Sequence, residues 1–319
     1  MINNKEILIT GGTGSLGTAL VKLLKARYKP RGIRIFSRSE LKQAEMKAKF
    51  GHEGISYLIG DIRDRNRLKM ASYGVDIIIN CAAIKRIEVA ENDPIECIKT
   101  NITGTENVIY AALENQVEKV FHISTDKAVY PTTLYGSTKK CAEDLIIRAN
   151  IYKKRTGLPR FSCARYGNVF GSNGSVIQLF QKQKALGVLT VTDLQMTRFW
   201  ITIPTVAQFI LDRIDDMRGG EIFVPKMASM AVVDIAKTIS PEAKIKTIGL
   251  RGMEKLHECL ITEEESAYVS HRTPIASDTS FYTIDKSMLP HLLDKFTYSS
   301  DKNSFQLTRD ALRKMIEEL

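Results

Sequence analysis

Two pairs of residues in this chain could transfer protons, and they lie close together in the sequence. Tyr135 and Lys139 are four residues apart, which places both side chains on one face of a helix. A nearby ammonium group lowers the pKa of a tyrosine, so the phenol can accept the proton of a substrate hydroxyl. Asp126 and Lys127 place a carboxyl group beside an amine shortly before that helix. Oxidation of an alcohol needs only the first pair, so the second pair suggests a further proton transfer, such as an elimination.

Both pairs also have plainer interpretations. A Tyr/Lys pair is common on the surface of helices, and an Asp-Lys pair is common in a charged loop after a strand. The position of Tyr135 favours a catalytic role, because its helix follows the fifth predicted strand, which ends at 124–125. Lys127 needs a lowered pKa to act as a base, and burial near other cations, such as Lys85 and Lys139, can produce one.

The segments that must position these residues alternate between short apolar strands and helices. The predicted strands are 6–10, 33–37, 56–59, 75–81, 119–124 and 161–165, and the predicted helices are 16–28, 41–50, 65–73, 95–114 and 134–156. This alternation is typical of a parallel sheet, and almost purely apolar strands indicate helices on both faces. The predicted fold class is therefore α/β, a Rossmann doubly wound parallel sheet with a smaller mixed C-terminal region.

The alternation weakens after Gly167, where loops lengthen. We expect residues 1–166 to form the dinucleotide-binding domain, with a helix at 202–218 returning to it. Residues 167–319 are then mainly the substrate-binding region. The chain has no low-complexity linker, which favours a hinged two-lobe body over two independent domains.

A glycine-rich turn joins the first predicted strand to the first predicted helix. It has the spacing G-x-x-G-x-x-G, which lets the backbone approach a pyrophosphate at the N-terminus of the helix. Such a triplet alone is weak, because ordinary strand-to-helix turns also contain it. The strand before it and the helix after it match the required context, so we predict a dinucleotide site. The expected contacts in this loop are Gly11, Thr13, Gly14, Ser15, Leu16 and Gly17.

The end of the second predicted strand selects between NADP and NAD. An acidic residue there would bind the ribose 2′-hydroxyl of NAD, but this chain has Ser37 and Arg38, with Lys42 one helical turn later. The two cations can pair with a 2′-phosphate, although they can also be ordinary surface residues. We predict NADP, with NAD as the less favoured cofactor.

Further cofactor contacts are expected after the next strands. Asp61 and Ile62 follow the third strand and can hold the adenine amino group. Small residues after the fourth strand leave room for the cofactor, and a hydroxyl at Thr125 would face the nicotinamide. The additional predicted contacts are Ala82, Ala83, Lys85, Asn101, Tyr135 and Lys139.

The composition of the chain argues against several other classes of protein. The chain has 319 residues, 44% of them hydrophobic, and a net charge of +10 that is spread along the sequence. Nothing resembles a nucleic-acid recognition motif, and no apolar stretch is long enough to span a membrane. The five cysteines are scattered without C-x-x-C spacing, so we expect no metal site and no disulfide framework. The first residues lead directly into a strand, so we expect no signal peptide and a cytoplasmic protein.

Ten segments together resemble a known family. The chain is similar to the extended short-chain dehydrogenases/reductases, and more closely to the inverting UDP-N-acetylglucosamine 4,6-dehydratases, over nearly its whole length. The matching segments are 9–15 (ITGGTGS), 37–38 (SR), 60–64 (GDIRD), 99–101 (KTN), 124–128 (STDKA), 134–136 (LYG), 165–169 (RYGNV), 196–200 (MTRFW), 221–226 (EIFVPK) and 254–258 (EKLHE). Segments 124–128 and 196–200 are specific to this resemblance, whereas the glycine loop is not.

The resemblance implies a role for each chemical residue. Tyr135 would serve oxidation at C4, Lys127 would remove the C5 proton and Asp126 would help to expel the C6 hydroxyl. Thr125 and Lys139 complete the implied catalytic set. Enzymes that retain the C5 configuration resemble this chain but carry Asp-Glu at this place, so Lys127 implies inversion.

The resemblance also implies partners. They are a UDP-N-acetylhexosamine substrate, tightly bound NADP that is regenerated in each turnover, and further copies of the chain in a dimer or hexamer. The product would enter bacterial-type surface sugar biosynthesis. The implied sugar-nucleotide contacts are Lys85, Asn168, Gly174, Ser175, Val176, Arg198, Arg251 and Glu254. Relatives usually read Arg-Pro-Gly-Glu-Lys where this chain has RGMEK at 251–255.

Two other functions remain open at this point. A UDP-sugar 4-epimerase on the same fold needs Tyr135 and Lys139 but not the Asp126-Lys127 pair. A non-catalytic dinucleotide-binding protein needs neither pair, and the intact Tyr135 and Lys139 argue against it.

Overall fold

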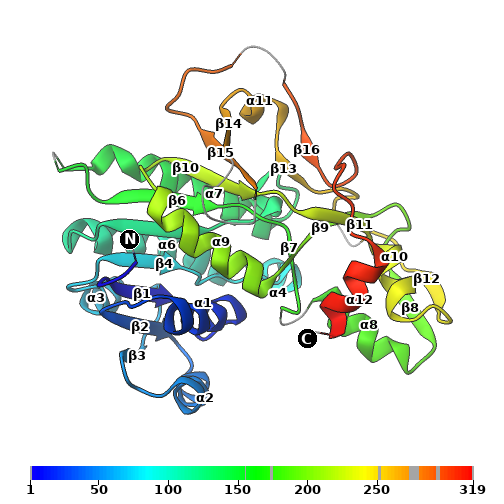
Figure 1. The fold of residues 1–319 in the computed structure, drawn as a ribbon, viewed down its shortest axis with the longest axis horizontal. Helices are drawn as coiled ribbons and strands as arrows, with labels where there is room; N and C mark the ends of the chain where they lie inside the picture. The colour runs from blue at the N-terminus through cyan, green and yellow to red at the C-terminus, as the bar shows by residue number, and fades with distance from the viewer. Residues whose placement is uncertain are drawn as a thin grey trace.

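The computed structural model describes residues 2–154, 156–172, 175–250, 253–272, 280–291 and 295–317. Its centre is a nine-stranded sheet in the order β14-β15-β10-β6-β5-β4-β1-β2-β3 (Figure 1). The strands are β1 (Glu6–Thr10), β2 (Gly32–Ser37), β3 (Ile55–Ile59), β4 (Ile77–Asn80), β5 (Lys119–Ile123), β6 (Arg160–Ala164), β10 (Glu221–Pro225), β14 (Val269–Arg272) and β15 (Phe281–Asp285). From β3 to β10 the strands are parallel, and β15 is antiparallel to both of its neighbours.

Helices cover both faces of this sheet. On one face α1 (Ser15–Arg27) packs against α9 (Ile203–Asp216), and α2 (Glu40–Phe50) lies beyond them (Figure 1). On the other face α6 (Gly104–Glu114) packs between α3 (Arg65–Ala71) and α7 (Leu134–Arg148). The strand order reverses between β1 and β4, which is where a doubly wound sheet opens its binding crevice. The predicted fold class is confirmed.

Two predicted helices differ from the structure. The helix expected at 95–114 is divided into α5 (Pro94–Ile98), a π-helical turn (Lys99–Thr103) and α6, and α4 (Ile87–Asn92) precedes it without having been predicted. Pro94 starts a new helix because it has no N–H to continue the previous one. The helix expected at 134–156 ends at Arg148 and continues only as a 3-10 turn (Ala149–Tyr152). Apolar periodicity alone did not show these interruptions.

A smaller lobe carries its own apolar core. It contains α8 (Val176–Lys184), β8 (Val188–Val191), α10 (Val232–Ile239), β12 (Lys244–Thr247) and α12 (Arg309–Glu317), at the right of Figure 1. The buried side chains there include Phe170, Phe180, Trp200, Ile235 and Leu312. A three-stranded sheet joins this lobe to the large sheet through β7 (Asn168–Phe170), β9 (Thr197–Thr202) and β11 (Ala228–Ala231).

Residues beyond 166 also contribute to the large sheet. Strands β10, β14 and β15 lie in it, so the large sheet is built from residues on both sides of residue 166. Next to them are β13 (Cys259–Ile261), α11 (Glu263–Ser266) and β16 (Tyr298–Ser299). The assignment of 167–319 to sugar binding remains a prediction.

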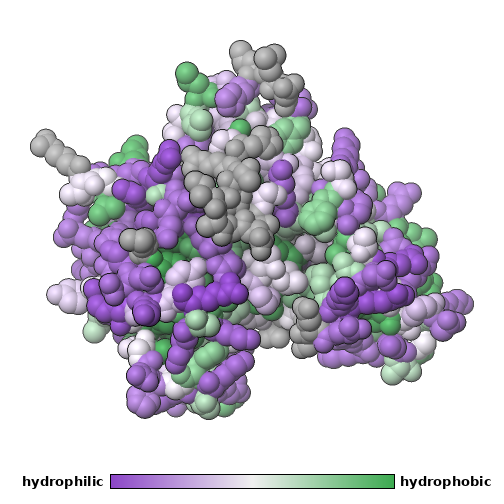
Figure 2. All heavy atoms as spheres, viewed as in Figure 1, coloured by the Kyte–Doolittle hydropathy of each residue, from purple (hydrophilic) through white to green (hydrophobic). Residues whose placement is uncertain are grey.

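The surface is mostly hydrophilic on the face that Figure 2 shows. Hydrophobic side chains are scattered over this view, and the outline is notched between the part with α1 and the part with α8 and α12. Within the described ranges, no helix combines the length and the apolar character needed to cross a bilayer.

A buried ion-pair cluster connects the Rossmann part of the chain with the segment that contains α11. Arg165, at the end of β6, pairs with Glu143 of α7 at 2.5 Å and with Glu265 of α11 at 2.8 Å. Its guanidinium also donates to the Leu260 carbonyl at 2.8 Å. Arg165 and Glu143 are fully buried, so neither ion can exchange its partner for water.

We predict that Arg165→Met destabilises the protein by about 3–5 kcal/mol, because it leaves two buried carboxylates without their cation. Urea unfolding followed by circular dichroism would measure the loss. The matched control is Arg313→Met, which removes an exposed pair with Asp310 and should change the free energy of unfolding by less than about 1 kcal/mol. A similar small effect at Arg165 would contradict the structural role of the cluster.

Candidate active site

The glycine loop leaves a helix N-terminus open above the sheet. Gly11 has a φ of +63°, and a Cβ there would lie 2.8 Å from the Ala82 backbone. The turn closes with a 2.9 Å hydrogen bond from Gly14 N–H to the Gly11 carbonyl. Gly14 is the N-cap of α1 and gives no side-chain cap, so the first N–H groups of α1 remain available to an anion. Thr13 lies in the turn, and Ser15, Leu16 and Gly17 form the first turn of α1.

The cations Arg38 and Lys42 follow the end of β2, with Glu40 between them in the first turn of α2. Arg38 is 61% exposed, and Lys42 lies in the first turn of α2, whose N-cap is Ser39. Ser37 is buried and accepts a hydrogen bond from Gln43 at 3.0 Å. Asp61, after β3, pairs with Arg63 at 2.6 Å and with Arg38 at 4.0 Å.

These contacts affect the Asp61 carboxylate. Burial raises its pKa, but the hydrogen bonds and charge of Arg63 outweigh burial, and the pKa is lowered. Ile62 is buried, and its backbone carbonyl accepts a hydrogen bond from Asn107 at 3.0 Å. The side chain of Asp61 is therefore an anchored acceptor beside the Arg38 cation.

The loop after β4 is clamped by Asn101. Its side-chain oxygen accepts from Ile84 N–H at 2.9 Å, and its amide donates to the Ile84 carbonyl at 3.1 Å and to Thr138 at 3.0 Å. The π-helical turn places this side chain, and such turns are frequent at functional sites. Asn101 thus fixes the loop that carries Ala82, Ala83 and Lys85, of which the last two are exposed.

Tyr135 and Lys139 lie one turn apart on α7, as predicted. Gly136 allows α7 to approach the 3-10 turn Asp126–Ala128, because a Cβ there would lie 2.5 Å from the Lys127 carbonyl. Burial raises the pKa of Tyr135 to about 12, although the nearby Lys127 charge and a hydrogen bond with Thr125 act in the opposite direction. Burial lowers the pKa of Lys139 to about 8.

A buried polar chain beneath Lys139 was not predicted. Lys139 Nζ lies 3.2 Å from His122 Nε2, and Asn80 Nδ2 donates to His122 Nδ1 at 3.0 Å. Asn80 in turn accepts from the Thr10 hydroxyl at 2.6 Å. Burial lowers the pKa of His122 well below its usual value, so the ring is neutral. With Asn80 donating at Nδ1, the proton of the ring lies on Nε2 and faces Lys139, which favours the neutral amine.

Asp126 is fully buried beside Lys127. Asp126 Oδ1 accepts from the Thr125 hydroxyl and from Lys127 Nζ, each at 3.0 Å. Its other oxygen, Oδ2, has no hydrogen-bond partner among the described residues. Burial raises the pKa of Asp126, and the Glu258 charge adds to this effect while Lys127 opposes it.

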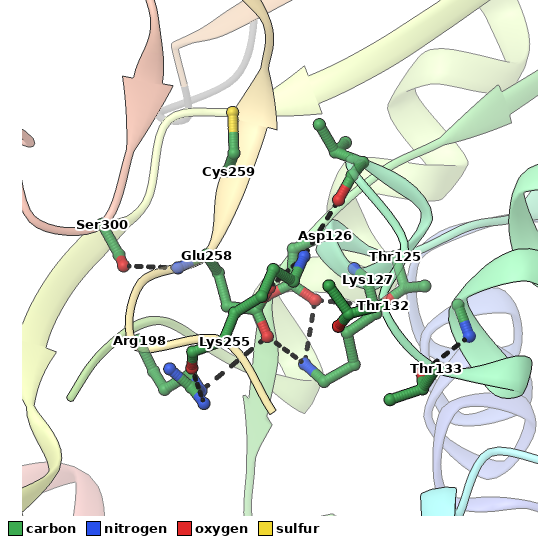
Figure 3. A network of polar contacts seen from close by, with 12 residues as sticks. Thr125, Asp126, Lys127, Thr132, Thr133, Arg198, Lys255, Glu258, Cys259 and Ser300 are labelled. Carbon is green, nitrogen blue, oxygen red and sulfur yellow. Dashed lines mark hydrogen bonds and ion pairs between the residues drawn. The ribbon is translucent and has the colours of Figure 1, made fainter. Parts of the chain in front are cut away.

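Glu258 completes a charged cluster that the sequence did not identify as part of the site (Figure 3). One of its oxygens lies 3.3 Å from Lys127 Nζ, and the other lies 2.8 Å from Lys255 Nζ. Arg198 lies 3.9 Å away. Burial opposes ionisation of Glu258, but Lys127, Arg198 and Lys255 lower its pKa to about 2. The side chain is only 3% exposed, so its charge depends on these cations.

The expected lowering of the Lys127 pKa is wrong for this arrangement. Burial does lower it, but the carboxylates of Asp126 and Glu258 are stronger and raise the pKa of Lys127 above its usual value, even against Arg198. The prediction relied on neighbouring cations, whereas the charges that dominate are anions. The amine also donates to Asn168 Oδ1 at 3.3 Å.

The predicted sugar-nucleotide contacts are only partly gathered at this cluster. Asn168 lies in it, and Arg198 is buried there with hydrogen bonds to the backbone carbonyls of Lys255 and Leu256, both at 2.9 Å. Ser175 is the N-cap of α8, with a buried hydroxyl, and Val176 begins that helix. Glu254 is half-buried. Gly174 and Arg251 lie outside the described residues. No group of acidic, histidine or cysteine side chains in the described part of the chain could hold a metal ion.

Comparison with known proteins identifies the family. A family model described as "Polysaccharide biosynthesis protein" matches residues 7–277. The chain belongs to this family.

Two named relatives and one solved structure show which members of known families the chain is similar to. The chain is 44% identical over 318 residues to a UDP-N-acetylglucosamine 4,6-dehydratase (inverting) from Campylobacter jejuni, with 95% of this chain and 94% of that protein covered. It is 38% identical to a UDP-glucose 4-epimerase from Rickettsia typhi, with 84% and 80% covered. The crystal structure of Pen from Bacillus thuringiensis has a TM-score of 0.89 at 36% identity and covers 100% of this chain and 99% of that one. The resemblance inferred from the ten segments is confirmed.

We predict that the buried Lys139 makes stability depend on pH. Its pKa of about 8 in the folded protein is below the ordinary lysine value of about 10.4 in the unfolded chain. Between these values the unfolded chain binds more protons, so Lys139 contributes stability that grows as pH rises. The free energy of unfolding of the native protein minus that of Lys139→Met should rise by up to about 3 kcal/mol between pH 7.5 and 10. Denaturant unfolding at both pH values would measure it, and a constant difference would contradict the assignment.

Proposed function

We propose that this protein is a hydro-lyase that converts UDP-N-acetylglucosamine into a UDP-2-acetamido-2,6-dideoxy-4-keto hexose with inversion at C5. The observation that carries the proposal is the pair of a fully buried Asp126 and a partly buried Lys127, joined by a 3.0 Å contact, next to Tyr135. The similarity to an inverting dehydratase over nearly the full chain supports the same reaction.

Each residue has one task in this proposal. Tyr135 accepts the proton of the C4 hydroxyl, Lys139 holds the ribose, and the charge of Lys127 opposes the rise in the phenol pKa that burial causes. Lys127 removes the C5 proton, which the C4 ketone has made acidic. Asp126 protonates the C6 hydroxyl as it leaves as water, and its raised pKa helps it to carry that proton. Thr125 orients Asp126 through their 3.0 Å hydrogen bond.

The residues present fit a bound nicotinamide dinucleotide. The uncapped N-terminus of α1 would hold the pyrophosphate, and Asp61 would accept from the adenine amino group. Arg38 and Lys42, at the N-terminus of α2, would hold a 2′-phosphate, so we propose NADP rather than NAD. When bound, the cofactor would take hydride from C4 and return it to C6.

The UDP-sugar would lie between the large sheet and the smaller lobe. Lys85, Asn168, Ser175, Val176 and Glu254 remain the proposed contacts among the described residues, together with Arg198 at the base of the cluster. Residues 167–319 are the part we assign mainly to sugar binding. The cationic side chains suit the diphosphate.

Further partners and location follow from the same proposal. We propose that the chain forms a homo-oligomer, a dimer or hexamer, and acts in the cytoplasm on the way to a surface sugar. The cysteines are all free thiols, which fits a reducing compartment.

A 4-epimerase is the second candidate, because the Rickettsia relative is named as one. It would use Tyr135 and Lys139 but has no step that requires Asp126 and Lys127. The two functions therefore predict different products from the same substrate.

We predict that the purified protein, incubated with UDP-N-acetylglucosamine in deuterated water, releases a product that has lost one water and gained one deuterium at C5. Mass spectrometry gives the composition, and NMR coupling constants give the inverted C5 configuration. Lys127→Ala should form this product about 10²–10⁴-fold more slowly, because it lacks the base. A product of unchanged mass would identify an epimerase. Normal C5 exchange in Lys127→Ala would exclude the lysine as the base.

We predict that Arg38→Ala weakens NADP binding by about 10–100-fold and leaves NAD binding nearly unchanged, because only NADP loses a charge-assisted contact. Isothermal titration calorimetry with both cofactors would measure the two losses. Arg67→Ala is a control, because Arg67 donates to the Ile59 carbonyl nearby at 2.8 Å and has no proposed contact to the phosphate. An equal loss for both cofactors would assign Arg38 to stacking on adenine.

A further inference from the structure

Glu258 has no role in the reaction as proposed, yet it contacts the residue that must act as the base. It comes from the segment before β13, far from Lys127 in sequence, and its carboxylate lies 3.3 Å from Lys127 Nζ. Only 3% of its side chain is exposed, compared with 21% for Lys127. A carboxylate buried at this place is costly, so its contact with the lysine calls for a functional explanation.

We propose that Glu258 is a positioning residue that holds Lys127 as an ammonium beside Asp126, so that the pair becomes an acid and a base only when Lys127 leaves Glu258. The inference rests on the proposed function in one respect, the use of this pair in an elimination. The contact itself and its effect on Lys127 are independent of the substrate.

The position of Glu258 is fixed by its backbone. Glu258 N–H donates to Ser300 Oγ at 3.0 Å (Figure 3), and the Glu258 carbonyl accepts from Ser300 N–H at 2.8 Å. Ser300 Oγ lies 2.7 Å from the Thr197 hydroxyl. Lys255, which pairs with the second oxygen of Glu258, also donates to the Val129 carbonyl at 2.9 Å. The backbone of Glu258 is therefore fixed, and its carboxylate can turn away only by breaking the ion pairs with Lys127 and Lys255.

The charges that face Lys127 come from several elements. Asp126 lies on the same 3-10 turn, Glu258 before β13, and Arg198 on β9. Tyr135 on α7 is close enough to feel the Lys127 charge. Lys255 pairs with the same carboxylate as Lys127, through its other oxygen. Two carboxylates thus contact the amine directly, and both favour its charged form over the neutral one.

One proton transfer converts this pair into the acid and base that the reaction requires. The N–H bond of Lys127 breaks and an O–H bond forms on Asp126, across the existing 3.0 Å contact. The product is a neutral amine and a neutral carboxylic acid, so the total charge of the pair is unchanged. Glu258 opposes the transfer, because it attracts the ammonium directly. It also determines where the amine lies, together with Asn168 at 3.3 Å.

The test is Glu258→Gln, which keeps the shape of the side chain and removes its charge. Lys127 then loses one of two anionic partners, and its titration should move to lower pH by about 1–3 units. Competitive acylation at a series of pH values, read by mass spectrometry of the Lys127 peptide, measures this without any substrate. Glu263→Gln is the matched control, because Glu263 is exposed on α11 and lies outside the cluster. It should leave the Lys127 titration where it is in the native protein.

The second measurement is C5 hydrogen exchange of UDP-N-acetylglucosamine against pH. Exchange rises as Lys127 loses its proton, so in Glu258→Gln the rise should occur at a pH lower by the same 1–3 units. Glu258→Asp, which retains the charge, should restore much of the native profile. An unchanged Lys127 titration in Glu258→Gln would overturn the inference. If the Lys127 titration moves in Glu258→Gln but neither the native protein nor the variant exchanges the C5 hydrogen, the effect of Glu258 on Lys127 is supported. The proposed reaction is then contradicted.

The native protein alone also tests the inference, should the glutamine variant not fold. Its Lys127 ammonium should persist to higher pH than an ordinary lysine, with a midpoint above about 10.4. A midpoint below that value would overturn the role of Glu258.

Discussion

The burial of the Asp126 carboxylate is the constraint on which the rest of the site depends. A carboxylate with no exposed surface needs a cation, and Lys127 supplies it at 3.0 Å. That lysine and two further cations then require a second anion, which Glu258 provides from a distant part of the chain. The site is therefore complete only when the segment before β13 closes over the end of β5. The charge balance of the site and the contact between these two segments therefore depend on the same ion pairs.

The same requirement explains why two lysines of the site behave in opposite ways. Lys139 is buried next to a neutral histidine, so burial lowers its pKa to about 8. Lys127 is partly buried and contacts two carboxylates, so its pKa is raised. Side-chain type alone gives the same expectation for both residues. The partners that each element brings to the amine decide which lysine holds its proton.

The sequence predicted the parts of the structure that local pattern determines. The strands β1 to β6, the glycine loop and the placement of Tyr135 and Lys139 follow from apolar runs, glycine spacing and helical periodicity. It did not predict Glu258 or His122, because their roles arise from residues that only the folded chain brings together. Its placement of Asn101 among the cofactor contacts stays a prediction, but the π-helical turn and the hydrogen bonds of Asn101 to the Ile84 backbone were not predicted. Pairing across a sheet and interruptions of a helix leave little trace in the local sequence.

The adjacent residues Asp126 and Lys127 are held by different parts of the molecule. Asp126 is fixed by the large sheet, since its N–H donates to the Tyr166 carbonyl at 3.0 Å and its carboxylate accepts from Thr125. Besides Asp126, the Lys127 amine contacts Asn168 on β7 and Glu258 before β13, both in the C-terminal part of the chain. A shift of the C-terminal segments would therefore move the amine while the carboxylate stays in place. The 3.0 Å contact between the two side chains therefore depends on how the segments that carry Asn168 and Glu258 pack against the Rossmann sheet.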